Sequence, residues 1–316
     1  IFSMAWENQS FNSEFILLGI FDHSSTHIFL FCLVLSIFTV AFMGNTIMVH
    51  YCGHQLHIPM YLFLSQLSLM DLMLICTTAP KIAFNYLSGR KSISLAGCGT
   101  QIFFYVSLLE AEYFLLAAMA YDLYVAICHP LRYSVLMGHN ICCLMAVPSW
   151  IISLLDGVIV IAVALSFPYR GAQEIAHFFC DVPALLTLSC TDTLLFERLM
   201  FIYCVILLLR PVAVIIASYA CVIVAIVHMG SGEGHSKPFA TCSSHLMVVG
   251  MYCGVAMFIC MRPVSDHSCI QDKMVSAFYT ILTPMLNPII YSLHDKEVVT
   301  TLMKVLRKGK SGEQIA

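Results

Sequence analysis

The sequence predicts an all-α membrane protein, namely a seven-transmembrane helix bundle with a short amphipathic C-terminal helix. Composition is the first reason, because the 316 residues are 60% hydrophobic and only 10% charged, whereas soluble domains typically contain about 25% charged residues. Hydropathy patterning is the second, because seven apolar stretches are long enough to cross a bilayer, which takes about 20 residues. The small net charge of −3 and the lack of a basic stripe argue against nucleic-acid binding.

The predicted spans follow one another along most of the chain and divide it into three regions. Residues 1–27 form an N-terminal region, residues 28–293 the transmembrane domain, and residues 294–316 the C-terminal helix and tail. Polar loops separate the spans, and the longest loop covers residues 166–195. In chain order, the predicted spans are residues 28–49, 59–87, 98–128, 141–165, 196–227, 239–261 and 274–293.

The C-terminal region carries apolar residues at helical spacing, with basic residues on the other side. This pattern favours a short helix lying on the membrane surface, although a soluble amphipathic helix has the same pattern. The apolar side is formed by Val298, Val299, Leu302, Val305 and Leu306, and the basic side by Lys304, Arg307, Lys308 and Lys310.

Two features at opposite ends of the chain predict its orientation. Asn8 opens the sequon Asn-Gln-Ser, which must lie outside the cytoplasm to be glycosylated. The basic cluster after the seventh span suits the anionic inner leaflet. An odd number of spans puts the two ends on opposite faces, so we expect the N-terminus outside and the tail in the cytoplasm. Most of the 15 cysteines are expected to be small buried hydrophobic residues.

Six short motifs occur in a fixed order along the chain. The most specific is MAYDLYVAICHPLRY at residues 119–133. The others are GN at 44–45, LHIPMYLFLSQLSLMD at 56–71, SYACVIVAI at 218–226, KPFATCSSH at 237–245 and PMLNPIIYS at 284–292. In this combination the chain resembles the vertebrate odorant (olfactory) receptors, a family of rhodopsin-like G-protein-coupled receptors. The segments HMGSGEG and ENQSFNSEFILLGIF look most like the M-type and T-type receptors of family 2.

The resemblance implies an odorant-binding receptor of the plasma membrane. Such a receptor holds a small apolar ligand in the outer half of the bundle and signals through a stimulatory olfactory-type G protein and cyclic AMP. The implied partners are an odorant, a heterotrimeric G protein and membrane lipid, with no nucleic acid and no cofactor. One alternative is a decayed, pseudogene-like receptor with the same fold, retained in the endoplasmic reticulum. A second is a small membrane transporter, but no internal duplication supports it, and no catalytic constellation supports an enzyme.

One motif departs from the family pattern at the position that meets the G protein. Leu123 stands where the family has arginine, and leucine neither carries charge nor donates a hydrogen bond. We therefore expect Asp122 to lose its partner and G-protein coupling to weaken. Further arginines of close relatives are replaced here by Cys221, His235, Ser236 and His294, which favours the decayed receptor. The resemblance assigns G-protein coupling and activation to Asp122, Leu123, Tyr124, Tyr219, Asn287, Pro288 and Tyr291.

Two carboxylates are predicted to lie at bilayer depth, where charges are costly and usually paired or functional. These are Asp71 in the second span and Glu112 in the third. By resemblance they line a sodium or proton site, and Asn45 supplies a further oxygen ligand. A protonated structural hydrogen-bond network is the alternative interpretation.

The resemblance also implies a disulfide between Cys98, at the start of the third span, and Cys180 in the long loop. It leaves Cys190 without the partner that close relatives supply. Three neighbouring side chains have the chemistry of metal ligands, namely His177, Cys180 and Asp181. Cys180, however, is expected to form the disulfide. No metal site is therefore expected.

The odorant site is expected, by resemblance, between the outer halves of the third, fifth, sixth and seventh spans. Glu110 and Arg210 are unusual charges at matched depth there, and we hypothesise that they form an ion pair. The alternative is that Arg210 faces lipid. The expected ligand-binding residues are Ile102, Tyr105, Val106, Leu109, Glu110, Tyr203, Leu207, Tyr252, Cys253, Ala256, Cys260, Ala277 and Thr280.

Overall fold

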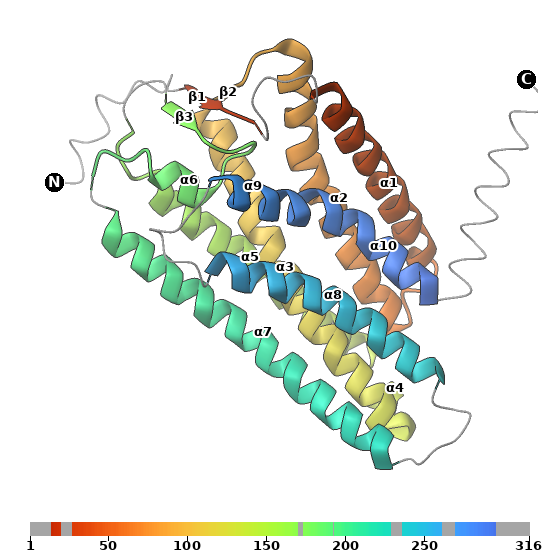
Figure 1. Ribbon diagram of the computed structural model, residues 1–316. Helices are drawn as coiled ribbons and strands as arrows, with labels where there is room; N and C mark the ends of the chain where they lie inside the picture. Colours follow the sequence, from red (N-terminus) through yellow and green to blue (C-terminus); the bar gives the residue numbers. More distant parts are fainter. Residues whose placement is uncertain are drawn as a thin grey trace, which may run out of the picture.

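The computed structural model describes residues 14–19, 27–169, 173–191, 193–228, 236–260 and 269–294, and its architecture is a helical bundle with a small sheet at one end (Figure 1). Within these residues, six helical segments are long and apolar enough to cross a membrane. The remaining long helix contains a shorter apolar stretch, His245–Val255. Together these segments form the predicted bundle of seven spans. The predicted glycosylation site Asn8 and C-terminal amphipathic helix lie outside the described residues.

The first two spans are helices α1 (His27–Gly53) and α2 (Pro59–Ser88). Pro59 occupies the first turn of α2, where its missing N–H costs nothing and its fixed φ suits a helix. Gly89 ends the helix at φ +66°, a left-handed conformation that glycine adopts without strain. Both ends of α2 therefore lie within a residue of the predicted span, because proline and glycine mark them in the sequence.

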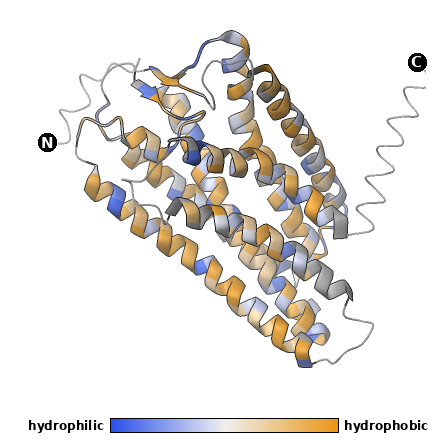
Figure 2. Ribbon diagram, viewed as in Figure 1, coloured by the Kyte–Doolittle hydropathy of each residue, from blue (hydrophilic) through white to orange (hydrophobic). Residues whose placement is uncertain are grey.

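The next three spans are α3 (Leu95–Cys128), α5 (His139–Ala164) and α7 (Leu194–His228). Ser94 caps α3 by accepting a hydrogen bond from the Gly97 N–H at 3.1 Å, as serine commonly does. The short helices η1 (Pro130–Arg132) and α4 (Tyr133–Leu136) connect α3 to α5. Figure 2 shows hydrophobic residues along the length of α7, and many of them are exposed, including Leu199, Ile202, Leu209, Ile216 and Ile223. Such a surface suits lipid.

The sixth span is α8 (Ser236–Cys260), and the seventh is built from three pieces. These are α9 (Cys269–Ala277), the π-helical turn η4 (Phe278–Leu282) and α10 (Thr283–His294). Pro288 lies inside α10, and a β-carbon added at Gly44 of α1 would meet its ring at 3.0 Å. The small residue at position 44 therefore lets α1 pack closely against the proline-containing helix.

The segments outside the predicted spans contain β-strands, which the all-α prediction does not include. Strands β1 (Glu14–Leu17), β2 (Ser92–Ser94) and β3 (Gln173–Ile175) form a sheet in the order β2-β1-β3. β1 pairs antiparallel with β2 and parallel with β3. The short helix α6 (Val182–Leu186) follows. We call these three strands and α6 the cap; Figure 1 shows it at one end of the bundle.

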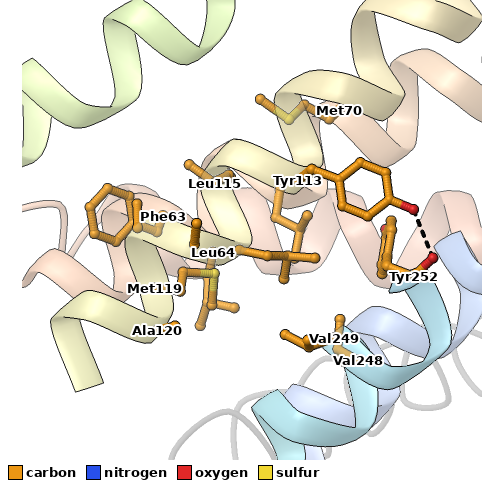
Figure 3. Packing of buried hydrophobic residues seen from close by; sticks show 14 of the residues in the cluster. Phe63, Leu64, Met70, Tyr113, Leu115, Met119, Ala120, Val248, Val249 and Tyr252 are labelled. Carbon is orange, nitrogen blue, oxygen red and sulfur yellow. Dashed lines mark hydrogen bonds between the residues drawn. The ribbon is translucent and has the colours of Figure 1, made fainter. Parts of the chain in front are cut away.

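Buried apolar side chains form one cluster along the bundle and a second beneath the cap. Figure 3 shows part of the first, where Leu64 of α2, Met119 of α3 and Val249 of α8 lie together. Close packing of α3 on α5 depends on Gly157, because a β-carbon there would overlap Ser107 Oγ. Helix α3 thus runs through the centre of the molecule and contributes to every site described below.

Candidate functional site

A fully buried polar cluster lies in the core of the bundle, around Asp71 of α2. Asn287 of α10 donates hydrogen bonds to Asp71 Oδ2 at 2.9 Å and to Tyr252 Oη at 2.8 Å. The exposed fractions are 0% for Asp71, 1% for Tyr252 and 2% for Asn287. One amide therefore ties three helices, α2, α8 and α10, to one another, and Pro288 follows that amide directly.

A second carboxylate, Glu112 of α3, lies close enough to Asp71 for their charges to interact. It accepts a hydrogen bond from the hydroxyl of Tyr279, which lies in the π-helical turn of the seventh span. On the same helix as Glu112, Tyr113 donates to the backbone carbonyl of Tyr252 at 2.7 Å, as the dashed line in Figure 3 shows. Tyr279 and Tyr113 were not among the predicted ion-site residues, since no short motif marks either one.

Asn45 of α1 is buried and links its helix to the same region. Its side-chain N–H group donates to the Ala41 carbonyl at 3.0 Å and to the Pro284 carbonyl at 2.7 Å. The amide therefore serves first as a donor that holds α1 against α10. Its oxygen accepts no hydrogen bond.

Four buried side-chain oxygens of this cluster accept no hydrogen bond within the part of the chain that the structure describes. They are Asn45 Oδ1, Asp71 Oδ1, Glu112 Oε1 and Asn287 Oδ1. Leaving such acceptors unsatisfied typically costs about 1–3 kcal/mol each, and the two interacting carboxylates add repulsion when both are ionised. Chemically, the arrangement suits either a shared proton or a hard cation that takes oxygen ligands.

A column of aromatic side chains leads from this cluster toward the cap. Tyr105 of α3 packs against Tyr279 with ring centroids 6.0 Å apart and against Phe179 at 5.0 Å. Tyr279 in turn packs against Tyr252 at 5.6 Å. A disulfide joins Cys98, at the start of α3, to Cys180, and therefore fixes Phe179 over the end of the column.

The predicted ligand-binding residues differ in their surroundings. Ile102 packs beneath the cap, whereas Tyr252 belongs to the polar cluster. Thr280 is fully buried and donates to the Ser276 carbonyl at 2.7 Å. Val106, Leu109, Leu207, Cys253 and Ala277 are half-buried. The side chains of Ala256 and Cys260 lie outside the described part of the structure.

A cavity of about 450 Å³ opens at the cap end, between α2, β2 and α3. None of the predicted ligand-binding residues line it. Its walls are mostly polar and include Glu14, Lys81, Ser92, Thr100 and Gln101. Lys81 is held there by a 2.7 Å hydrogen bond to the Ser92 carbonyl.

The hypothesised ion pair between Glu110 and Arg210 is wrong. Arg210 is exposed on the outer surface of α7, and both carboxylate oxygens of Glu110 lack a hydrogen-bond partner. The two charges still act on one another, and Asp156 of α5 also faces Glu110. Matched depth along two helices does not determine which way a side chain faces, and Arg210 is exposed.

At the opposite end of the bundle, Asp122 keeps a partner, contrary to expectation. It accepts a 2.8 Å hydrogen bond from the hydroxyl of Tyr133 in α4. Burial, and then the charge of Asp122, raise the pKa of Tyr133, so the hydroxyl keeps the proton that it donates. Leu123 packs against the main apolar cluster. The connecting helix thus supplies a neutral donor where the family pattern has an arginine.

Three other predicted activation residues, all tyrosines, lie near this end of the bundle, whereas Asn287 and Pro288 lie at the polar cluster. The Tyr124 hydroxyl is 3.2 Å from His129 Nε2. The hydroxyl of Tyr219 in α7 bonds to Nδ1 of the buried His245 in α8. Tyr291 of α10 lies close enough to Tyr219 for the two hydroxyl groups to interact, and its own oxygen is buried without a hydrogen bond.

No three His, Cys, Asp or Glu side chains gather as metal ligands within the described residues. Cys190 is an exposed free thiol.

Comparison with known proteins agrees with this architecture. The family model described as "Olfactory receptor" matches residues 31–309. Human Olfactory receptor 2M7 is 67% identical over 312 residues, which cover 98% of this chain and 100% of the relative. Human Olfactory receptor 2T8 is 52% identical, covering 95% of this chain and 97% of the relative. Mouse Olfactory receptor 2V1 is 52% identical, covering 98% and 99%. The predicted resemblance is confirmed, and the transporter and enzyme alternatives are not supported. The chain belongs to the olfactory receptors, which are multi-pass odorant-binding G-protein-coupled receptors.

Proposed function

We propose that this receptor binds a small odorant in the half of the bundle nearest the cap and passes that event to a G protein at the opposite end. The observation that carries the proposal is the continuous column from Phe179 through Tyr105 and Tyr279 to the polar cluster at Asp71. A ligand that displaces Tyr105 acts directly on Tyr279, and hence on the seventh span. The family's odorant and G-protein partners suit this arrangement.

The cap end is proposed to face outward, and the protein to reside in the plasma membrane. The disulfide between Cys98 and Cys180 supports this orientation, because disulfides persist in oxidising compartments and not in the cytoplasm. The extracellular N-terminus would carry a glycan on Asn8. The end with Tyr133 and Leu123 then faces the G protein.

The four unsatisfied oxygens of the polar cluster are proposed to hold a sodium ion in the resting receptor. Asp71 and Glu112 supply the charge, and Asn45 and Asn287 offer neutral oxygens. A proton shared by the two carboxylates is the competing occupant. Sodium should therefore raise the unfolding temperature of the purified receptor more than potassium does, and Asp71→Asn should abolish the difference. Equal stabilisation by both ions would favour the proton.

Coupling is proposed to run through a stimulatory olfactory-type G protein to cyclic AMP, at reduced strength. Leu123 supplies no charge to the G protein, although the Tyr133 contact keeps Asp122 in place. The decayed-receptor alternative predicts no coupling at all and retention in the endoplasmic reticulum.

The test is to express the full chain with trafficking chaperones, measure its surface display, and record cyclic AMP responses to an odorant panel. Leu123→Arg is measured in parallel. We expect surface display of both proteins and a larger response from the variant. Intracellular retention of both, with no response to any odorant, would reject the proposed function.

A further inference from the structure

A second group of charged side chains lies within the membrane-spanning part, away from Asp71. Glu110 of α3 is 6% exposed, and it faces Asp156 of α5. Tyr203 of α7 completes the group, with a hydroxyl placed to donate a hydrogen bond to Asp156. Glu110 and Glu112 are two residues apart and project roughly 200° apart around α3. The two carboxylate sites are therefore separate.

The local charges do not balance. Glu110 and Asp156 contribute two negative charges when ionised, and Arg210 is the one cation that acts on Glu110 within the described structure. Arg210 lies exposed on α7 and makes no ion pair with Glu110. Both Glu110 oxygens are buried and accept no hydrogen bond from the described residues. An ionised carboxylate in that setting requires a donor.

A ligand that satisfies both carboxylates in their ionised form must carry positive charge and hydrogen-bond donors. Glu110 and Asp156 lie close enough to share a proton, but two ionised carboxylates cannot hydrogen-bond each other, so Asp156 satisfies Glu110 only while one of them is protonated. The Tyr203 hydroxyl has one proton, which is directed to Asp156. A primary ammonium group has three hydrogen-bond donors and one positive charge. It therefore matches both the Glu110 oxygens that lack a donor and the net negative charge left by Glu110, Asp156 and Arg210.

We propose that Glu110 and Asp156 form the recognition site for the protonated amino group of a small aliphatic amine. This rests on the proposed function, because it names the chemical class of odorant for that ligand site. The half-buried Val106 and Leu109 lie on the same helix within one turn of Glu110, and they offer apolar surface to the alkyl chain. Arg210 acts against the site by repelling the incoming cation.

The test compares n-hexylamine with 1-hexanol, which shares its alkyl chain but carries no charge at neutral pH. Binding to the purified full chain in lipid nanodiscs is measured by thermal shift, a readout that does not depend on G-protein coupling. We expect hexylamine to bind at least about tenfold more tightly than hexanol, the lower end of what a hydrogen bond to a charged group typically contributes. Equal binding of the two compounds, or no hexylamine binding, would overturn the proposal.

Variants sharpen the assignment to these residues. Glu110→Gln and Asp156→Asn should each weaken hexylamine binding about tenfold or more, without changing hexanol binding. Arg210→Met should strengthen hexylamine binding, an effect that a merely structural role does not predict. Glu174→Gln, which removes an exposed charge from β3, is the control and should change neither. Undiminished hexylamine binding by Glu110→Gln would reject the site.

The two levels of proposal fail in different ways. If odorants of other classes activate the receptor but amines show no preference, this inference fails and the proposed function stands. If no odorant in the panel binds or activates the surface-displayed receptor, the proposed function fails, and the amine site fails with it.

Discussion

Replacing Gly157 by alanine should destabilise the receptor by forcing apart two helices of its centre. The new methyl group would overlap Ser107 Oγ and would lie 3.1 and 3.3 Å from two ring atoms of Phe103. Ordinary contacts of this kind begin at 3.4 Å. Rotating the serine hydroxyl away relieves the first overlap but not the crowding by the phenyl ring, so side chains of α3 must shift. Overpacking of this kind typically costs about 1–3 kcal/mol.

The matched control is Gly250→Ala in α8, where an added β-carbon meets nothing within 4 Å. Alanine in place of glycine within a helix typically gains about 0.5–1 kcal/mol. The two substitutions are chemically identical, so helix propensity is common to both and their difference isolates the clash. We expect them to differ by about 1–3 kcal/mol, the cost of the clash.

The assay is the unfolding temperature of the purified receptor in nanodiscs, with surface display as a second readout. Adding Ser107→Ala to Gly157→Ala should restore part of the lost stability, because it removes the overlapped oxygen, and coupling between contacting residues is typically about 0.5–3 kcal/mol. Equal unfolding temperatures for the two glycine variants would refute the reasoning, as would a failure of the serine change to restore any stability.

Three further outcomes follow from the contacts at the two ends of the bundle. Tyr133→Phe removes the hydrogen bond to Asp122 and should cost about 1.5–3 kcal/mol in chemical denaturation, as hydrogen bonds to charged groups typically do; an unchanged midpoint would contradict this. Because the pKa of Tyr133 is raised above its ordinary value of 10.0, the stability that this hydroxyl contributes is complete below pH 10.0 and is lost as pH rises further. The difference in stability between wild type and Tyr133→Phe should therefore stay constant between pH 8 and 9 and narrow in more alkaline buffer. Cys180→Ala should cost about 2–4 kcal/mol by opening the disulfide with Cys98, and should reduce surface display; Cys190→Ala, at an exposed free thiol, is the control and should change neither measurement.

The helical framework was predictable because its signals are local and strong. Each span consists of an apolar run bounded by polar residues, and Pro59 and Gly89 mark both ends of α2. The cap was missed because its strands are only three or four residues long. The segments Glu14–Leu17, Ser92–Ser94 and Gln173–Ile175 are too short for alternation to stand out, and they pair with partners far away in sequence.

The candidate sites were predictable only where a motif marked them. Asp71 and Asn287 lie in recognisable segments, and the structure joins them directly. No motif includes Tyr279 or Asp156. A single polar residue within an apolar run does not indicate which way its side chain faces. The partner of Asp122 was missed for a related reason, since Tyr133 acts from a connecting helix whose docking depends on tertiary packing.

The sheet order has a consequence for biogenesis. β1 is the first strand to be synthesised, yet it occupies the middle of the sheet, and Leu17 pairs with Ile175. A ribosome adding about 5–20 residues per second needs roughly 8–30 s to make the 158 residues that separate that pair. β2 is synthesised earlier and can pair with one edge of β1. The other edge lacks its partner β3 until four spans have been synthesised, so the cap can be completed only after the first half of the bundle has been made.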